Sequence, residues 1–148
     1  MRAVLLRLAA LAAAGTVAAV LLWPSPVDRP VYGYVLRALA WLQARGLPDW
    51  VAYNDVERLA NVALFVVPGL LVSLLLPRRL WWLALALCIC LSAGMELAQE
   101  VFLPERSASG RDVLLNAAGA LIGVVLGVAL HSLGAARRRS RHRGLRPK

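Results

Sequence analysis

Charged residues and cysteines are both scarce in this sequence. Only 17% of its 148 residues are charged, against 60% that are apolar, whereas a soluble domain usually carries about 25% charged residues. The two cysteines, Cys88 and Cys90, point to different sides of a helix, so they form neither a redox pair nor a zinc site. The two histidines, His131 and His142, have no partner at a metal-ligand spacing. We therefore expect no metal and no cofactor.

Acidic residues are also few, and none of the eight lies near the basic carboxyl-terminal tail. The formal net charge is +9, and seven of the seventeen Lys and Arg side chains fall in residues 137–148. Such a tail is typical of the cytosolic side of a membrane protein, where it contacts anionic lipid. A nucleic-acid-binding module would carry aromatic residues and a foldable core among its cations. We therefore do not expect nucleic acid as a partner.

Long apolar stretches are what the sequence has instead. About 20 apolar residues are needed to cross the lipid hydrocarbon as a helix, and residues 4–23, 54–76, 80–103 and 113–133 are the stretches of about that length. The sequence therefore predicts an all-α protein, an integral membrane bundle of four transmembrane helices. Its expected parts are a first transmembrane helix (1–23), an outer loop (24–54), a three-helix core (55–133) and a basic cytosolic tail (134–148).

The first apolar stretch has two interpretations. Arg2 and Arg7 ahead of an apolar run also occur in cleavable signal peptides, but the apolar part of those usually spans only about 7–15 residues and ends at small residues. Here the run ends at Leu22-Trp23-Pro24. We therefore expect a retained membrane anchor.

The outer loop contains a second, shorter pattern. After three prolines, residues 31–45 repeat apolar side chains at Val31, Val35, Ala38 and Leu42. This spacing predicts a short helix that lies in the membrane interface, and nearby Tyr and Trp residues fit an aromatic belt. The alternative is a helix that only packs over the mouth of the bundle.

Polar side chains interrupt the third apolar stretch at Ser92, Glu96, Gln99 and Glu100. Steps of three and four residues place them on one face of a helix. An ionisable group at membrane depth costs about 2.5–3.5 kcal/mol, so it usually faces protein or trapped water and marks function. Glu96 lies ~10 Å from the end of its helix and is the one we expect to be buried. Its expected partners are Arg106 and Arg111.

Small residues mark where helices approach one another. Pro68-Gly69 lies inside the second stretch, and Gly119, Gly123 and Gly127 follow one another at steps of four residues in the last. Such a ladder lets another helix come close. We expect it to pack within the bundle, and the alternative is the pairing of two copies into a homo-oligomer.

Two helix starts carry capping patterns. Asn54 followed by Glu57 predicts a cap for the second stretch, and Ser109 followed by Asp112 predicts one for the last. For Glu57 and Asp112, a structural role at a helix start therefore competes with a role in a binding site.

The distribution of cations sets the orientation. With both termini and residues 77–79 in the cytosol, eleven of the seventeen Lys and Arg side chains lie there, and all eight acids lie outside or in the outer half of the bundle. Three helix ends then meet at the outer level, and two helix amino termini direct positive dipole ends into the same mouth. One pocket is predicted there, lined by Glu57, Asn61, Glu96, Gln99, Glu100, Arg106, Ser109, Arg111, Asp112 and Asn116.

Residues 57–123 resemble the VanZ-like membrane proteins. The resemblance rests on Asn61-x3-Phe65 with Pro68-Gly69, on Glu96-x2-Gln99, and on Arg106-x2-Ser109-x2-Asp112-x3-Asn116-x2-Gly119-x3-Gly123. The family commonly has F-x-P-x-G where this chain has Phe65-Val66-Val67-Pro68-Gly69, and often Asp in place of Glu57. The resemblance implies a multi-pass protein of the bacterial cytoplasmic membrane. The founding member is associated with low-level teicoplanin resistance, and the family has no settled biochemical activity.

Binding and catalysis are the two main functional interpretations. The first is a non-catalytic envelope protein whose pocket binds an amphiphile or a cell-wall-related ligand, with a link to glycopeptide tolerance. The second is a membrane-embedded enzyme for a lipid-linked substrate, with Glu96, Glu100 and Asp112 as acid and base and two arginines, Arg106 and Arg111, holding a phosphate or carboxylate. No nucleophile stands beside a base at a recognisable spacing, which favours binding. A transporter ranks third, because four spans show no inverted repeat.

The orientation is directly testable. We predict that an impermeant cysteine reagent labels positions near Arg106 in intact cells and positions near Arg138 only after the cells are opened, because the cation bias places both termini inside. Labelling in the reverse order would show the opposite orientation.

Overall fold

The computed structural model describes residues 2–21, 31–102 and 110–144, and this part of the chain is helical with no strand. The helices are α1 (Arg2–Leu21), α2 (Tyr32–Gln43), α3 (Tyr53–Leu75), α4 (Trp81–Phe102) and α5 (Gly110–Gly144), with a 3-10 turn, η1 (Arg78–Leu80), before α4. The predicted all-α class is therefore confirmed. The last helix is longer than its predicted span, because it continues through the basic tail to Gly144.

Three helices of the described part are long and apolar enough to cross a membrane: Tyr53–Leu75, Arg78–Phe102 and Gly110–Gly134. The apolar part of α1, Val4–Val20, is shorter. The chain is thus a membrane protein whose described part has three helices of spanning length, and the predicted fourth span in α1 stays a prediction.

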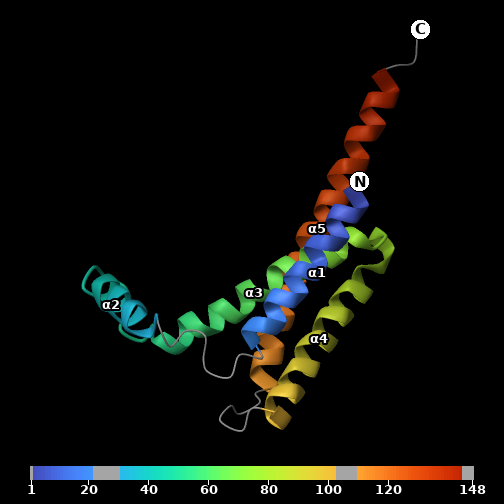
Figure 1. Ribbon diagram of the computed structural model, residues 1–148. Coiled ribbons are helices and arrows are strands. Elements are labelled where there is room, and N and C mark those ends of the chain that lie inside the picture. Colours follow the sequence, from blue (N-terminus) through green and yellow to red (C-terminus); the bar gives the residue numbers. More distant parts are fainter. Residues whose placement is uncertain (1, 22–30, 103–109, 145–148) are drawn as a thin grey trace.

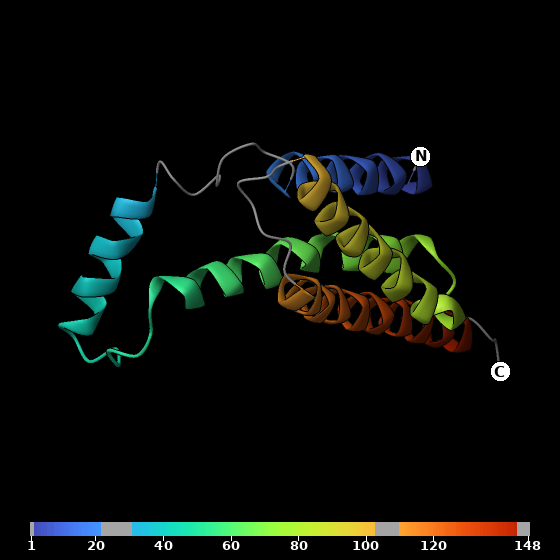
Figure 2. The same cartoon turned by 90° about the horizontal axis from the view of Figure 1, so that it is seen from below.

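Helices α1, α3, α4 and α5 pack against one another as a bundle, and α2 stands away from it (Figures 1 and 2). Along the bundle α3 and α5 run in one direction, and α1 and α4 run in the other. The start of α3, the end of α4 and the start of α5 therefore face the same way. We call this end of the bundle the polar end, because the polar side chains described below lie there.

The closest contact in the bundle joins α5 to α3 through the predicted glycine ladder. A Cβ added to Gly119 would lie 2.8 Å from the carbonyl carbon of Val62, and one added to Gly123 would lie 2.6 Å from the amide nitrogen of Leu70. Gly127 meets the side chain of Ser73 in the same way. The ladder therefore packs against α3, which covers the face that was the alternative site for a second copy.

Pro68 and Gly69 are both buried at the centre of α3, which continues as a helix through the proline. A Cβ on Gly69 would lie 2.9 Å from the Cα of Ala120. Both helices thus present small residues at their crossing, as close backbone approach requires.

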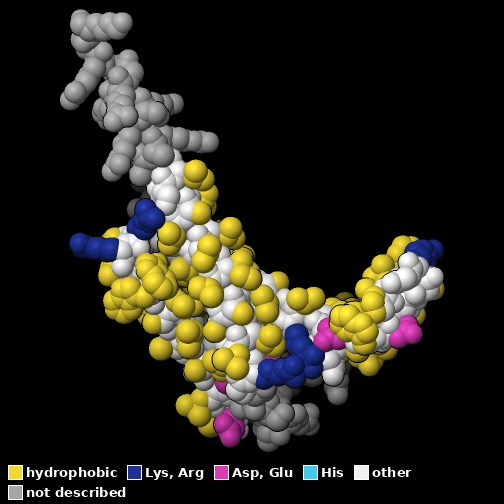
Figure 3. All heavy atoms as spheres, turned by 180° about the vertical axis from the view of Figure 1, so that it is seen from behind, with side chains coloured by type: hydrophobic (Ala, Val, Ile, Leu, Met, Phe, Trp, Pro, Cys, Tyr) yellow, Lys and Arg dark blue, Asp and Glu magenta, His cyan; other side chains and the backbone are white. Residues whose placement is uncertain are grey.

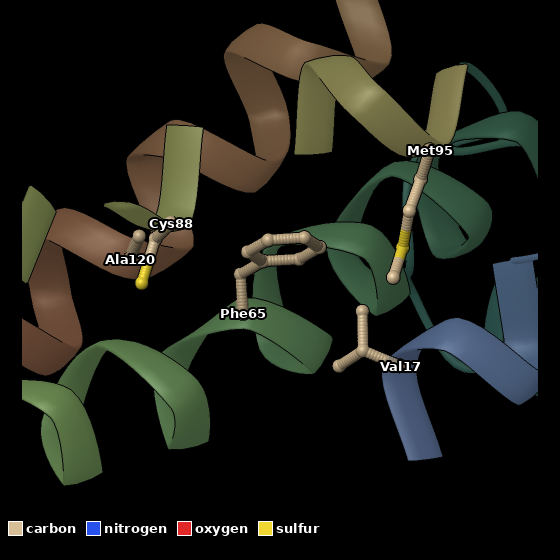
Figure 4. Packing of buried hydrophobic residues seen from close by; sticks show 5 residues of the cluster. All are labelled: Val17, Phe65, Cys88, Met95 and Ala120. Carbon is tan, nitrogen blue, oxygen red and sulfur yellow. The ribbon is translucent and has the colours of Figure 1, made fainter. Parts of the chain in front are cut away.

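The apolar core lies beside this crossing and receives side chains from all four helices of the bundle (Figure 4). Phe65 is fully buried, and Met95 of α4 and Val17 of α1 pack around it. Cys88 belongs to this core, whereas Cys90 is exposed. The two cysteines therefore point to different sides of α4, as predicted.

The cap of α3 differs from the prediction. The helix begins at Tyr53, and the carboxylate of Asp55 accepts a hydrogen bond of 3.0 Å from the backbone N–H of Ala52. Asp55 therefore makes the reaching-back contact that was assigned to Glu57, because the helix starts earlier than the Asn54 cap implied. Glu57 therefore does not cap α3.

A helix forms where the short interfacial one was predicted, but its predicted apolar face is mostly uncovered. Val31, Ala38 and Leu42 are exposed, and Leu39 is the residue of α2 that is buried. Tyr32 at its start stacks edge-on against Tyr53 with ring centroids 4.5 Å apart. The membrane-interface position of α2 stays a prediction.

The glycine contact predicts that Gly123→Ala destabilises the bundle. The added methyl group would collide with the backbone of α3, and overpacking of this kind costs about 1–3 kcal/mol. Gly94→Ala is the matched control, because a Cβ there meets nothing within 4 Å and alanine favours a helix by about 0.5–1 kcal/mol. Thermal unfolding in detergent, followed by circular dichroism, measures both, and equal midpoints for the two variants would contradict the contact.

Candidate functional site

A hollow of about 200 Å³ opens at the polar end, between the first turns of α3 and α5. We call it the polar hollow. Its lining is formed by Asn54, Glu57, Arg58, Asn61, Arg111 and Asp112. On the surface, basic side chains gather where the arm formed by α2 and the start of α3 joins the bundle (Figure 3).

One acidic and one basic side chain of this hollow have no ion-pair partner among the described residues. Arg58 is bound to Asp55 at 2.7 Å, and this is the one salt bridge found within the described residues. Glu57 and Arg111 are exposed and have no such partner in that part of the chain. A negative and a positive side chain are therefore both available to a ligand at the mouth of the hollow.

Asn61 and Asp112 form the floor of the hollow and join α3 to α5. The Asn61 amide nitrogen donates to a carboxylate oxygen of Asp112 over 3.4 Å, and both residues are half-buried. The two face each other because the glycine contact, which begins about two turns further along α5, holds α3 and α5 close together and parallel. The same contact that packs the bundle therefore positions the floor of the hollow.

Below the floor, Asn116 of α5 lies one turn further into the bundle. Its amide nitrogen donates to the hydroxyl of Ser92 on α4 at 2.9 Å. Its carbonyl oxygen has no donor within the described part of the chain, although only 1% of the residue is exposed. An unsatisfied buried acceptor costs about 1–3 kcal/mol, so a donor from water or from a ligand group would stabilise this position.

The polar face of α4 is narrower than predicted. Ser92, Glu96 and Gln99 are buried, and Glu96 is only 8% exposed, but Glu100 is exposed. The reason is that each step of four residues drifts by about 40° around a helix, and two steps from Ser92 carry Glu100 past the buried face. Glu100 is therefore not brought together with the other three side chains.

Glu96 and Gln99 both have interaction partners. Arg106 and Ser109, which were predicted to complete the pocket and to cap α5, lie outside the described residues. The pairing of Glu96 with Arg106 or Arg111 stays a prediction. Within the described residues, no three His, Cys, Asp or Glu side chains come together as a metal site would require.

A model of the VanZ/LLP1 family matches residues 10–131, from α1 to the end of the apolar part of α5. The chain belongs to the VanZ/LLP1 family. The predicted resemblance is thus confirmed, and the match extends it over α2 and most of α1. No match to the chain was found among curated proteins or among solved structures.

Several polar residues of this VanZ/LLP1 protein were missed at the sequence level. Asn54 and Arg58 line the hollow, and Asp55 both caps α3 and holds Arg58. The spacing of three residues between Asp55 and Arg58 was a usable signal for their ion pair. The Ser92–Asn116 bond joins different helices, so nothing in the spacing of a single sequence indicates it.

The Ser92–Asn116 bond gives a stability prediction for this family member. Ser92→Ala should lower the free energy of unfolding by about 0.6 kcal/mol, the average for interhelical hydrogen bonds in a membrane protein, and by at most about 1.7 kcal/mol. Ser132→Ala is the matched control, because within the described residues that hydroxyl bonds to the Val128 carbonyl of its own helix at 2.8 Å and to no other helix. Reversible unfolding in mixed micelles measures both. If Ser92→Ala and Asn116→Ala have fully additive effects, the two side chains do not interact.

Proposed function

We propose that this VanZ/LLP1 protein is a non-catalytic membrane protein that binds the polar head of an amphiphile in the polar hollow. The observation that carries the proposal is the state of Glu57 and Arg111, two charges of opposite sign that lie at one mouth without ion-pair partners among the described residues. A head group with both an ammonium and a phosphate or carboxylate would complement them.

Two further features support a binding site. Asp112 retains acceptor capacity beyond its long contact with Asn61, because a carboxylate has about four lone-pair sites. The unpaired Asn116 oxygen lies one turn deeper and would accept from a water or a hydroxyl beneath the head group. The set of polar atoms thus extends from the surface into the bundle, which suits a ligand held at the level of the lipid head groups.

The setting we propose is the bacterial cytoplasmic membrane, with both termini cytosolic and the polar hollow outside. The cation distribution supports this orientation. Arg37 and Arg45 of the α2 region lie over the rings of Tyr34 and Trp41, with 4.6 and 3.6 Å from each guanidinium carbon to the ring centroid. Such amphipathic side chains favour the membrane surface, and we place α2 there. The family supplies a link to teicoplanin tolerance, which we extend to this chain as part of the proposal.

Catalysis on a lipid-linked substrate is the second candidate, with Glu96, Glu100 and Asp112 as its acids and bases. The exposure of Glu100 counts against it, because this carboxylate does not share the buried face of Glu96. The buried Ser92 hydroxyl accepts from an amide, and an amide is not a base that would activate a nucleophile. The described residues therefore favour binding.

Ligand titration of the purified full chain tests the proposal. We expect saturable binding of phosphatidylethanolamine, measured by native mass spectrometry, and about fivefold weaker binding for Arg111→Gln and for Glu57→Gln, the loss of one exposed ion pair. Arg79→Gln is the matched control, because this exposed arginine lies in η1 at the opposite end of the bundle and should bind as the wild type does.

Three results would contradict the proposal. The first is that phosphatidylethanolamine does not saturate the protein, and the second is that all three variants bind equally well. The third is recovery of a lipid of altered mass from the wild type but not from Glu96→Gln, which would favour the enzyme instead.

A further inference from the structure

A second hollow of about 510 Å³ lies between α1 and α3, and it is apolar. We call it the apolar groove. It is lined by Ala13, Thr16, Val17, Ala60, Ala63, Leu64, Val67 and Pro68. The single hydroxyl among these side chains, that of Thr16, donates to the Ala12 carbonyl of its own helix at 2.9 Å. The groove therefore offers almost no hydrogen-bonding capacity to an occupant.

The groove opens to the outside of the bundle. Ala60, Ala63 and Val67 line it and are exposed, with Val67 at 51%. In a membrane protein of this hydropathy that side faces the hydrocarbon of the bilayer. The space stays open where the lining residues are alanines, because these side chains are too short to fill it.

The groove and the polar hollow are lined by neighbouring residues of α3. Glu57 and Asn61 line the hollow, and Ala60 and Leu64 line the groove. Residues three and four apart are neighbours on a helix surface, so Glu57 is one turn from Ala60 and Asn61 is one turn from Leu64. A ligand whose charged part contacts Glu57 would thus have the apolar groove within about one helical turn along α3.

We propose that the apolar groove holds an acyl chain of the same lipid whose zwitterionic head occupies the polar hollow. This inference rests on the proposed function and adds the place and the chemistry of the tail. The head is specified by the opposite charges of Glu57 and Arg111, and the tail by a groove without polar partners. The occupant is therefore a glycerophospholipid held at one site by its two parts, and not a soluble zwitterion.

A second copy of the chain is the competing occupant, because α1 is rich in small residues that would allow close helix contact. The nearby charged hollow favours the lipid, since an apolar helix of another copy would leave Glu57 and Arg111 without partners. Acyl chains are also present around the groove at the concentration of the bilayer itself. The test below includes the second copy as an outcome.

Two probes with the same head and different tails separate the two parts of the site. Native mass spectrometry compares long-chain phosphatidylethanolamine with its dihexanoyl form. We expect Ala63→Trp, which fills the groove, to weaken binding of the long-chain lipid about tenfold and to leave the short-chain lipid within about twofold of the wild type. Ala118→Trp is the matched control, because Ala118 is exposed on α5 and lies outside the groove.

The outcomes distinguish failure of the tail site from failure of the proposed function. Suppose that Arg111→Gln weakens binding of both lipids, whereas Ala63→Trp weakens binding of neither or of both equally. The head site would then stand, and the tail would not lie in the groove. If Arg111→Gln weakens neither lipid, the proposed function itself fails. A dimer that persists at saturating lipid and is lost in Ala63→Trp would assign the groove to a second copy.

A measurement on the unchanged protein keeps the inference testable if Ala63→Trp does not fold. A phosphatidylethanolamine that carries a diazirine in mid-chain is photolysed in vesicles that contain the full chain, and the attached peptides are mapped. We expect attachment to concentrate on residues 13–17 and 60–68. Attachment spread evenly over the exposed faces of α4 and α5 would overturn the proposal.

Discussion

The close approach of α3 and α5 is the contact on which the rest of the structure depends. Gly119, Gly123 and Gly127 allow it because a Cβ at any of them would collide with α3. In a membrane no hydrophobic effect drives helices together, so close packing and hydrogen bonds between helices must hold them. Close packing and interhelical hydrogen bonds both occur between α3 and α5. The packing places the Asn61–Asp112 bond at one end of the contact, and at the other the His131 ring lies 3.2 Å from the Ser73 carbonyl.

The sequence predicted those features that depend on one helix at a time. The apolar stretches, the glycine ladder and the burial of Glu96 follow from period and composition, and the structure contains all three. Glu100 and the cap of α3 were predicted wrongly because each depends on a small offset. For Glu100, each step of four residues turns the side chain by about 40° around the helix. For the cap, a helix start two residues earlier replaces Glu57 by Asp55 as the contacting side chain. The apolar groove depends on how α1 lies against α3, which no spacing in the sequence specifies.

Helix α3 contacts α5 on one face and borders the space beside α1 on another. Val62 and Leu70 lie against α5, whereas Ala60 and Ala63 face the space beside α1. Near its start α3 carries Glu57 and Asn61 into the polar hollow. One helix therefore borders the tightest contact, the charged hollow and the apolar groove. A change in its rotation would alter all three together, which makes the glycine contact important for the site as well as for stability.

The incomplete pairing of polar groups at the polar end supports the binding role that we propose. A purely structural polar network gains most when every donor and acceptor is satisfied. Here Asn116 keeps an acceptor without a donor in the described part of the chain, and Glu57 and Arg111 remain unpaired at the surface. Leaving Asn116 in this state costs stability, whereas replacing it and Ser92 by apolar residues of similar shape would remove the cost. The proposed ligand would supply the donor that Asn116 lacks, which is why this residue supports the proposal more strongly than the hydrated charges at the surface do.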